Sequence, residues 1–449
     1  MTTAVDPSPH RDAAPRIPLG LLATLALLSA VAPFSTDLYL PAFPQMAADL
    51  CTSPTNVQLT LTACLLGLAI GPLAFGPLSD RIGRLRPLLA GAAICVLASL
   101  AAALAPSIQV LIAARFAQGF AGAAGMVIGR AIIADLATGR AAARAFSLLM
   151  LVGGLAPVAA PLAGGFIVEP LGWRGALAVV LGLSVAMLVA VLVVVRESHT
   201  AQRRAQLHQQ KAVAGSPLRD LTGRAFVGQL IAFGFSFAMM MAYISASPFI
   251  YQNMMGLSSA QYGAAFGINA LGLLLSSGLS ARLSARHEPR RIAAVGLAII
   301  LGASGTVLAL TVARVPAGWL AVSLLAAACG MGLVYGNTTA LAQAAAPRAS
   351  GAASAALGTA QFLLAAAASP LVGLGGAHTA TPLGIVMLCA ASIACAGFVA
   401  AGRPSASRQP SAPPALPRAE GRYGERRCET SELCSMGVVG GLNPAGVLS

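Results

Sequence analysis

Long apolar runs separated by short polar connections make up most of this chain of 449 residues. A helix that spans a bilayer needs about 20 mostly apolar residues, and twelve runs meet that requirement. They cover residues 17–41, 55–77, 87–105, 107–136, 144–168, 172–195, 225–250, 260–281, 291–313, 317–343, 350–374 and 380–401. The pattern predicts an all-α integral membrane protein with twelve transmembrane helices.

The composition agrees with this interpretation. Hydrophobic residues make up 57% of the chain and charged residues only 9%, whereas charged residues make up about 25% of a soluble domain. So few charges cannot cover a water-facing surface, which excludes a soluble globular protein.

The net charge of +14 follows the topology. Arginines and lysines cluster after the second, fourth, sixth, eighth and tenth runs, and Arg174 and Arg314 are the exceptions on the other connections. This alternation is the positive-inside pattern, which predicts that both termini are cytoplasmic. The charge therefore records orientation, and we expect no nucleic-acid partner.

The longest polar interruption, 196–224, divides the runs into two sets of six. The halves show weak similarity: GPLSDRIG at 76–83 matches SGLSARLS at 277–284, and APLAGG at 160–165 matches SPLVGL at 369–374. Both matches fall at corresponding helices, which favours an internal repeat. We expect two pseudo-symmetric six-helix bundles with a substrate site between them near the bilayer midplane.

This division sets the expected domain organisation. The parts are a cytoplasmic N-tail at 1–16, an N-terminal bundle at 17–196, a cytoplasmic central loop at 197–224, a C-terminal bundle at 225–402 and a tail at 403–449. The last of these is rich in Pro, Ser, Arg and Gly, and we expect it to be disordered and cytoplasmic.

Motifs for catalysis and metal binding are missing from the sequence. The eight cysteines are scattered without a CxxC pair, and no nucleophile–base constellation or nucleotide-binding loop is present. We expect no catalytic residues, no metal and no cofactor. An ion gradient, rather than ATP, is then the expected driving force.

The turn between the second and third runs carries the stretch GPLSDRIGRLR at 76–86. Its glycines are expected to allow tight packing and sharp backbone turns. The stretch resembles the loop motif of the major facilitator superfamily. That resemblance implies a cytoplasmic charge network that includes an acid at the end of the fourth helix and holds the outward-facing state. The residues of this cytoplasmic gate are Gly76, Asp80, Arg81, Gly83, Arg84 and Asp135. The alternative is a surface charge cluster of little energetic weight.

The fourth run contains an arginine well inside the bilayer. Arg115, Gln118, Gly119 and Gly122 share one helix face, and the stretch at 111–125 resembles the fourth-helix motif of the same superfamily. A buried arginine costs at least about 2.5–3.5 kcal/mol on insertion scales, so it should face the bundle interior and have a partner. The alternative is that its side chain snorkels outward.

Asp37 is the expected electrostatic counterpart of Arg115. It lies in STDLYLPAFP at 35–44, about six residues from the expected outer end of the first helix, so both charges lie roughly 10 Å deep. Arg130 lies nearer the cytoplasmic end of the fourth run, where snorkelling is the favoured interpretation.

The fifth run contains GGLAPVAAPLAGG at 153–165. Proline kinks a helix, and glycine permits a close helix neighbour. The stretch is similar to the fifth-helix antiporter motif of the superfamily, with Ala160 where a glycine is usual. That motif is associated with exporters. Its candidate residues are Pro157, Pro161, Gly164 and Gly165. The alternative is the ordinary proline and glycine content of membrane helices.

Two stretches narrow the resemblance. STDLYLPAFP and the segment at 242–272 resemble the bicyclomycin and chloramphenicol resistance transporters, the Bcr/CflA group of drug:proton antiporters, over about residues 17–401. The first-helix acid of the group corresponds to Asp37. Some related exporters carry a second acid two turns earlier, where this chain has Ser29, so a two-acid mechanism and a strong preference for cationic drugs are both in doubt.

The resemblance implies proton-coupled multidrug efflux across the bacterial inner membrane, with Asp37 and Arg115 in proton coupling. The alternative is an importer or exporter of a small metabolite with the same fold. The expected partners are a small amphipathic drug or metabolite, protons and the lipid bilayer, and we expect a monomer. Polar and aromatic residues in the runs suggest a substrate cavity, although each of them has the alternative role of bonding helices together. These residues are Tyr39, Gln118, Tyr243, Asn269, Tyr335, Asn337 and Gln361.

Overall fold

A computed structural model describes residues 18–137, 139–198, 221–376 and 379–402, and every regular element in these ranges is a helix. The predictions for the tails at 1–16 and 403–449, and for most of the central loop, fall outside the described residues. Eleven helices of the described chain are long and apolar enough to cross a membrane. One of them, α6, is interrupted at Gly172 by a non-helical backbone conformation, so it supplies two of the predicted spans.

The N-terminal half contains the first six spans. They are α1 (Leu19–Asp37), α3 (Pro54–Ile82), α4 (Leu85–Ala103), α5 (Ile108–Leu136) and the two parts of α6 (Gly139–Val194). Between α1 and α3 lie the short helices η1 (Leu40–Ala42) and α2 (Phe43–Asp49).

The C-terminal half repeats this arrangement. Its spans are α8 (Arg224–Pro248), α9 (Ser259–Leu283), α10 (Pro289–Val312), α11 (Gly318–Ala345), α12 (Ser350–Ala368) and α13 (Thr381–Ala400). The π-helix η3 (Phe249–Met254) extends α8, and the 3₁₀ segment η5 (Ser369–Gly375) extends α12.

Short polar residues start several of these helices. The Ser53 hydroxyl accepts the backbone N–H of Asn56 before α3, and Ser107 accepts that of Val110 before α5. Before α9, Ser258 and Gln261 form a reciprocal capping box. These bonds satisfy backbone donors that the first helical turn leaves unpaired.

The first span is shorter than predicted. The apolar run extends to residue 41, but α1 ends at Asp37 and the chain bends into η1 and α2. Pro41 and Pro44 stand in the first turns of η1 and α2. A proline lacks the backbone N–H that an interior helical position needs, so it starts a new helix rather than continuing the old one. Asp37 therefore lies at the end of its helix, not two turns inside it.

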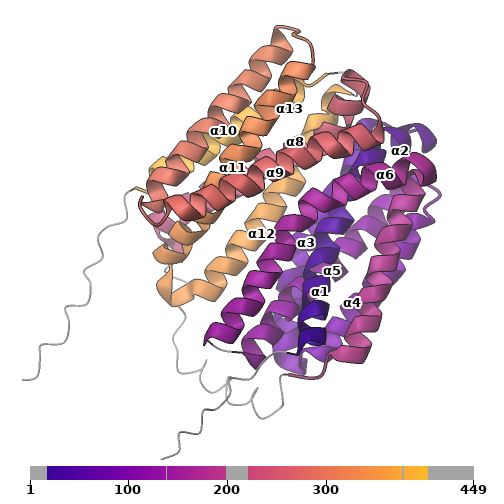
Figure 1. Ribbon diagram of the computed structural model, residues 1–449, viewed down its shortest axis with the longest axis vertical. Helices are drawn as coiled ribbons and strands as arrows, with labels where there is room; N and C mark the ends of the chain where they lie inside the picture. The colour runs from indigo at the N-terminus through magenta and orange to yellow at the C-terminus, as the bar shows by residue number, and fades with distance from the viewer. Residues whose placement is uncertain (1–17, 138, 199–220, 377–378, 403–449) are drawn as a thin grey trace, which may run out of the picture. The chain divides into compact units, whose positions relative to one another are not determined.

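The two halves form two bundles with matching helix pairings (Figure 1). In the N-terminal bundle α3 packs on α5 and α4 packs on α5; in the C-terminal bundle the equivalent helices α9 and α10 both pack on α11. Between the bundles, α3 contacts α12 and α6 contacts α9. These two contacts are equivalent under exchange of the halves, which agrees with the repeat predicted from the sequence.

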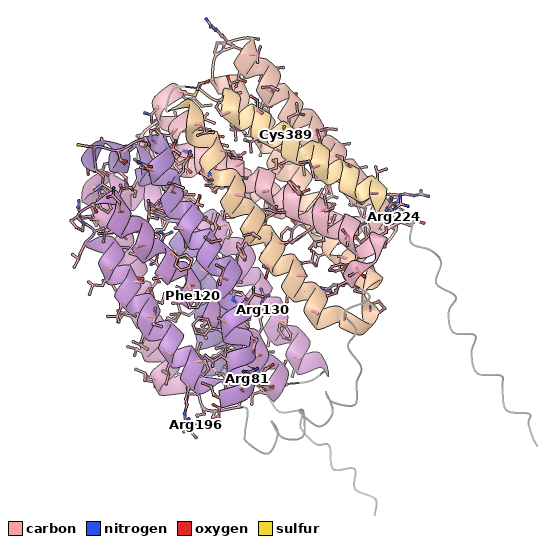
Figure 2. All side chains as sticks on the ribbon, turned by 180° about the vertical axis from the view of Figure 1, so that it is seen from behind. Arg81, Phe120, Arg130, Arg196, Arg224 and Cys389 are labelled. Atoms are coloured by element: carbon pink, nitrogen blue, oxygen red, sulfur yellow. The ribbon has the colours of Figure 1, made fainter. Side chains whose placement is uncertain are left out.

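Two ends of the described helices are distinguished below. The basic end is the one at which Arg81, Arg196 and Arg224 lie (Figure 2). The gate end is the opposite one, where α1 turns into η1 and where the chain turns at Gly172 and Gly256.

Candidate transport site

The two bundles touch closely at the gate end, where α6 meets α9. A Cβ built on Gly165 would lie 2.5 Å from the Ser259 carbonyl oxygen, and one built on Gly263 would lie 2.7 Å from the Pro161 carbonyl oxygen. Real Cβ atoms do not approach backbone oxygens so closely, so only glycine fits at these two positions. Of the predicted antiporter-type residues of the fifth span, Pro161 and Gly165 therefore form part of the contact between bundles.

The backbone after Asp37 takes part in the same contact. A Cβ on Gly164 would lie 1.9 Å from the Leu38 carbonyl oxygen, so α6 packs directly against this turn. The Pro41 carbonyl accepts hydrogen bonds from Gln252 Nε2 at 2.8 Å and from Ser259 Oγ at 3.5 Å. Both donors belong to the C-terminal half, so STDLYLPAFP forms the N-terminal side of this junction.

A second junction joins α3 to α8 and η5. Gln58 Nε2 donates to the Ser245 carbonyl at 3.2 Å, and the Ser369 hydroxyl donates to the Ser245 hydroxyl at 2.7 Å. A Cβ on Gly373 would lie 2.3 Å from Gln58 Oε1. Together the two junctions close the gate end between the bundles.

Asp37 lies directly beneath this closed gate. It is the last residue of α1 and is only 6% exposed. Its charge interacts with that of Arg115 on α5 and with the Tyr262 side chain of α9 in the other bundle. Within the described residues, no ion pair as short as 4.0 Å joins Asp37 to Arg115. The predicted interaction is thus one through space rather than a direct salt bridge.

Arg115 is completely buried and has other partners. Its Nη2 donates to the Ser35 carbonyl at 2.6 Å, and its Nη1 donates to the Ser35 hydroxyl at 3.2 Å and to Gln118 Oε1. The guanidinium carbon lies 4.3 Å from the centre of the Tyr39 ring, a cation–π geometry. The expectation that Arg115 faces the bundle interior with a partner is correct, and snorkelling is excluded for it.

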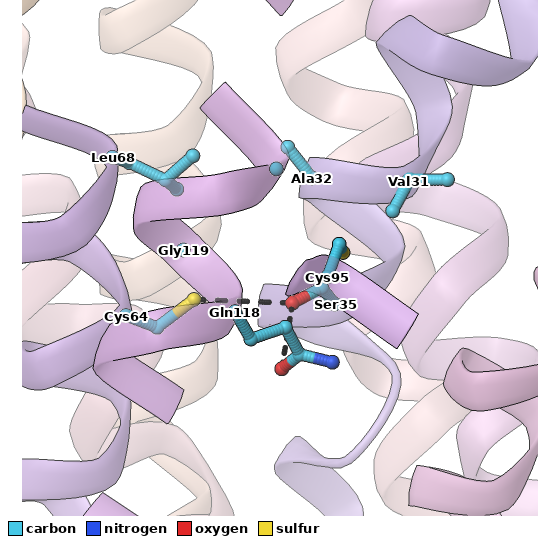
Figure 3. A pocket seen from close by; sticks show the side chains of 9 residues that line it. Val31, Ala32, Ser35, Cys64, Leu68, Cys95, Gln118 and Gly119 are labelled. Carbon is cyan, nitrogen blue, oxygen red and sulfur yellow. Dashed lines mark hydrogen bonds between the residues drawn. The ribbon is translucent and has the colours of Figure 1, made fainter. Parts of the chain in front are cut away.

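These bonds continue into a polar network that crosses the N-terminal bundle. Gln118 Nε2 donates to the Ser99 hydroxyl of α4 at 2.6 Å, and Ser99 bonds to Ser184 of α6 at 3.1 Å. Figure 3 shows Ser35 and Gln118 beside a pocket that is too tight for a water molecule. That pocket is a packing defect of the bundle rather than a place for substrate.

Three serines of this network were missed by the sequence reasoning. Ser35 stands two residues before Asp37, and its hydroxyl bonds to groups from two other helices. Ser99 and Ser184 lie in apolar runs with no motif around them. A serine in a membrane helix is too common to be singled out by itself, so no signal in the sequence distinguishes Ser99 and Ser184. Ser35 is the first residue of STDLYLPAFP, and its position in that stretch is the signal that could have found it.

Three of the four charged residues predicted to form the cytoplasmic gate meet at the basic end, namely Asp80, Arg84 and Asp135. Arg84 Nη1 lies 2.7 Å from Asp80 Oδ1, and Arg84 Nε lies 3.0 Å from Asp135 Oδ2. Arg84 Nη1 also donates to the Ser79 hydroxyl at 2.8 Å. All four residues belong to the N-terminal bundle, so the contacts described here hold α3, α4 and α5 together.

Glu197 completes this network and was not predicted. Its two carboxylate oxygens accept the backbone N–H groups of Arg84 at 2.9 Å and of Leu85 at 3.1 Å. A carboxylate at a helix N-terminus satisfies unpaired donors and interacts favourably with the helix dipole. Burial by itself would lower the pKa of the Arg84 guanidinium, but its hydrogen bonds to Asp135 and Asp80 raise that pKa above its ordinary value. Arg84 therefore stays charged throughout the physiological pH range.

The two glycines of the loop motif differ. Gly83 has a φ of 102°, a conformation that L side chains rarely adopt, so the sharp turn expected there is present. The expectation of tight packing is wrong for Gly76, because a Cβ there would meet only Val127 Cγ1 at 3.9 Å, an ordinary contact. Arg81 is exposed in the last turn of α3.

Six of the seven candidate cavity residues are buried, and Tyr335 is the exception at 41% exposed. Tyr39, Gln118 and Asn337 are buried among helices, and Asn337 Nδ2 donates to the Ser280 hydroxyl at 2.7 Å, which joins α11 to α9. The alternative role of bonding helices together describes the geometry of these three residues, and the hydrogen bonds described next give Asn269, Tyr335 and Gln361 the same role. The remaining four are Tyr243, Asn269, Tyr335 and Gln361, all in the C-terminal bundle.

Two of these four lie near the gate end. Asn269 Nδ2 donates to the Tyr251 hydroxyl at 3.1 Å. The Tyr243 ring stacks on Phe266 at 6.0 Å, and its buried hydroxyl has no hydrogen-bond partner among the described residues. The other two lie farther from the gate end, where the Tyr335 hydroxyl donates to Gln361 Oε1 at 3.2 Å.

No metal-binding cluster is present in the described part of the chain, where no three His, Cys, Asp or Glu side chains come together. The six described cysteines are all free thiols.

The comparisons with known proteins identify the family of this chain. The family model described as the Major Facilitator Superfamily matches residues 25–370 of this chain. The chain is a member of the Major Facilitator Superfamily. It is accordingly a multi-pass membrane transporter and not an enzyme.

Several curated proteins resemble this transporter along most of its length. An uncharacterized MFS-type transporter of Bacillus subtilis, YdgK, is 35% identical over 384 residues, which are 85% of this chain and 94% of that protein. A bicyclomycin resistance protein homolog of Haemophilus influenzae is 30% identical over 361 residues, 80% of this chain and 90% of that protein. The multidrug resistance protein MdtL of Escherichia coli is 27% identical over 384 residues, 84% of this chain and 95% of that protein. The resemblance to drug-resistance transporters is thus confirmed.

Solved structures show the same fold at low sequence identity. The D-xylose–proton symporter superposes with a TM-score of 0.64 at 14% identity and covers 84% of this chain and 96% of its own. A bacterial homolog of the human lysosomal transporter Spinster superposes with a TM-score of 0.66 at 16% identity, covering 85% and 96%. These likenesses confirm the predicted all-α fold of twelve spans in two bundles.

Proposed function

We propose that this transporter exports small amphipathic drugs across the bacterial inner membrane in exchange for protons. The observation that carries the proposal is the position of Asp37, a buried carboxyl group directly beneath the closed contact between the bundles. Asp37 lies within electrostatic range of Arg115 and, across the bundle boundary, of Tyr262. The likeness to the bicyclomycin resistance homolog and to MdtL supports the substrate class.

The coupling role follows from exposure. Removal from water and a nearby arginine act in opposite directions on the protonation of a carboxyl group. When the gate end opens, water reaches Asp37 and the balance changes. Asp37 then takes a proton from one side and releases it to the other as the substrate passes. A proton that moves inward gains about 2.3 kcal/mol for each 100 mV of membrane potential.

The orientation follows from the charges. Arg81, Arg84, Arg196 and Arg224 lie at the basic end, and the positive-inside rule places such residues in the cytoplasm. The gate end is then periplasmic, and this conformation is closed to the outside. Both termini are cytoplasmic under this assignment, and the exported compound enters from the basic end.

The test is proton-driven efflux by the purified transporter in proteoliposomes, with Asp37→Asn as the variant. The amide has almost the same shape as the carboxyl group but cannot bind and release a proton at neutral pH. We expect the wild type to transport a drug such as chloramphenicol against its gradient when a pH gradient is imposed. The activity of the variant should be at least about tenfold lower, which corresponds to a barrier higher by about 1.4 kcal/mol. Its downhill exchange of the drug without a pH gradient should persist.

Efflux by Asp37→Asn that still follows the pH gradient would remove Asp37 from the coupling role. A matched control is Asp49→Asn, because Asp49 lies at the same end but bonds to the Trp173 ring nitrogen at 3.0 Å. In an efflux-deficient host that expresses the protein, unchanged susceptibility to a broad drug panel would favour transport of a metabolite instead.

A further inference from the structure

Two arginines meet the last turn of α13 at the basic end of the C-terminal bundle, where Figure 2 shows Arg224. Arg224, the first residue of α8, donates from Nε to the Ala400 carbonyl at 2.7 Å. Arg290 of α10 donates from Nη2 to the Phe398 carbonyl at 3.4 Å, and its guanidinium carbon lies 4.6 Å from the centre of the Phe398 ring. The two carbonyls belong to the same last turn, so one helix end holds both guanidinium groups.

Capping of α13 accounts for these bonds but not for the rest of each guanidinium group. The last carbonyls of a helix lack intrahelical partners, and a positive side chain interacts favourably with that end of the helix dipole. An arginine has five N–H donors, and each of these bonds uses one of them. Arg224 is exposed and Arg290 is partly exposed, so further donors remain for a ligand. Because the protein already holds both groups in place, a ligand does not have to order them.

The charge at this end of the C-terminal bundle is almost entirely positive. Arg282, Arg286 and Arg291 are also exposed there. Residues 225–402 contain one acid, Glu288, and its carboxylate lies 3.6 Å from Arg291 Nε. In the N-terminal bundle, by contrast, the arginine of the loop motif is bonded to two carboxylates. The basic end of the C-terminal bundle therefore carries positive charge that its own acids do not offset, and an anionic ligand would offset it.

Exposed apolar side chains adjoin both arginines. Val227 of α8 and Val295 of α10 lie within two turns of Arg224 and Arg290, and they are 37% and 55% exposed. Val399 of α13 is 73% exposed. Apolar side chains on the outside of a spanning helix face the acyl chains of the bilayer. A positive group beside such a surface matches a phospholipid with an anionic head group, whereas a soluble anion would match only the positive group.

We propose that Arg224 and Arg290 bind the head group of an anionic phospholipid at the end of α13, a role that does not depend on the proposed export function. The phosphate group of the lipid accepts charge-assisted hydrogen bonds from the guanidinium groups, and the acyl chains lie along the exposed valines. Basic sites between spanning helices at the cytoplasmic face bind lipid head groups in this way. The basic end is cytoplasmic under the proposed orientation.

The experiment counts the lipids that bind to the full-length transporter in detergent micelles, by native mass spectrometry. The probes are dioleoyl phosphatidylglycerol and dioleoyl phosphatidylcholine, which share their acyl chains and differ in net charge, and glycerol 3-phosphate, a soluble anion without acyl chains. Titration with each lipid gives the Kd of the first bound molecule. One double variant combines Arg224→Gln with Arg290→Gln, and a second combines Arg224→Lys with Arg290→Lys. Arg196→Gln is the matched control, because it removes an exposed positive charge at the basic end of the other bundle.

We expect the wild type to bind phosphatidylglycerol about tenfold more tightly than phosphatidylcholine, the equivalent of about 1.4 kcal/mol. The double glutamine variant should lose this preference and keep its phosphatidylcholine binding within about twofold of wild type. The double lysine variant retains both charges and should keep most of the preference. Arg196→Gln should bind both lipids as the wild type does.

A second measurement needs no variant, because the glutamine substitutions also remove the bonds to α13. The preference of the wild type for phosphatidylglycerol should shrink as ammonium acetate is raised from about 0.1 M to about 0.5 M, since salt screens the attraction between exposed charges. A preference that does not change with salt would contradict binding through the arginines.

Equal binding of the two lipids by the wild type would overturn the site, and so would an unchanged preference in the double glutamine variant. A parallel loss of both lipids in that variant would indicate a structural role only. An equal loss of preference in Arg196→Gln would show attraction to the whole basic end rather than a site. Displacement of phosphatidylglycerol by an equal concentration of glycerol 3-phosphate would assign the arginines to a soluble anion instead of a lipid. The export function is decided separately, by the proteoliposome test of Asp37→Asn.

Discussion

At the scale of single residues, three arginines of the N-terminal bundle have three different surroundings. Arg115 is fully buried and bonded to Ser35 and Gln118. Arg84 lies between Asp80 and Asp135 at the basic end. Arg130 has no bonded partner in the described chain. The sequence places all three near or inside membrane spans, but their environments depend on which helices lie beside α5 and α3. The side chain of Arg130 is exposed, and the snorkelling expected for it stays a prediction.

The two carboxylates on Arg84 should contribute unequally to stability. The Asp135 side chain is 10% exposed and that of Arg84 9%, whereas the Asp80 side chain is 45% exposed. Breaking a buried ion pair costs about 3 kcal/mol or more because it leaves a charge unpaired, and an exposed pair contributes about 1 kcal/mol or less. We expect Asp135→Ala to lower the free energy of unfolding in mixed micelles by about 3 kcal/mol and Asp80→Ala to lower it by less than about 1 kcal/mol. Equal losses from both variants would contradict this ranking.

At the scale of elements, α6 packs both on the turn that follows Asp37 and on the other bundle. Gly164 packs on the Leu38 carbonyl, and Gly165 packs on Ser259 of α9. The proline and glycine pattern in the sequence indicated an unusual helix, and the resemblance indicated an exporter. The two surfaces that these glycines contact became visible only in the folded chain, because η1 and α9 are far away in sequence.

A branched side chain in place of the hydrogen of Gly165 should disfavour the closed state of the gate end. Overpacking costs about 1–3 kcal/mol, so Gly165→Val should reduce the population of the closed gate about tenfold or more. Gly153→Val is the matched control on the same helix, because a Cβ there meets nothing within 4 Å. Transport in proteoliposomes should fall in the first variant and stay within about twofold of wild type in the second. A normal transport rate in Gly165→Val would argue against a tight junction there.

At the scale of the whole molecule, the contacts between the two bundles of the described chain follow the internal repeat. The α3–α12 and α6–α9 contacts exchange when the halves exchange. A protein of this kind alternates by rocking one bundle against the other about a fixed site. The tight hydrogen-bonded junctions at the gate end, such as that of Gln252 with Pro41, must then break when the opposite end closes.

This motion has a measurable sign. The gate end is reported by spin labels on Cys51 and Arg314→Cys. The basic end is reported by labels on Arg196→Cys and Arg286→Cys. Each pair joins exposed positions on opposite bundles. The background carries Cys389→Ser, Cys428→Ser and Cys434→Ser, and the basic-end pair also carries Cys51→Ser, so that only the named positions are labelled. We expect double electron–electron resonance in nanodiscs to show a longer distance at the gate end whenever the distance at the basic end shortens, as pH or drug is varied. Distances that lengthen together at both ends would exclude rocking.

The sequence by itself determined the number of spans, the division into two similar halves, the fold family and the positions of the charges. Each of these depends on hydropathy, residue spacing or a short motif, all of which are local along the chain. The tertiary structure alone decided that Arg115 bonds to Ser35 and Gln118 rather than to Asp37, and that Glu197 caps α4. It also decided that the STDLYLPAFP turn is one side of a gate. Apart from the bond of Arg115 to Gln118 within α5, these contacts join residues from about 80 to more than 200 positions apart. The packing of the helices, which no local pattern encodes, selects which of them meet.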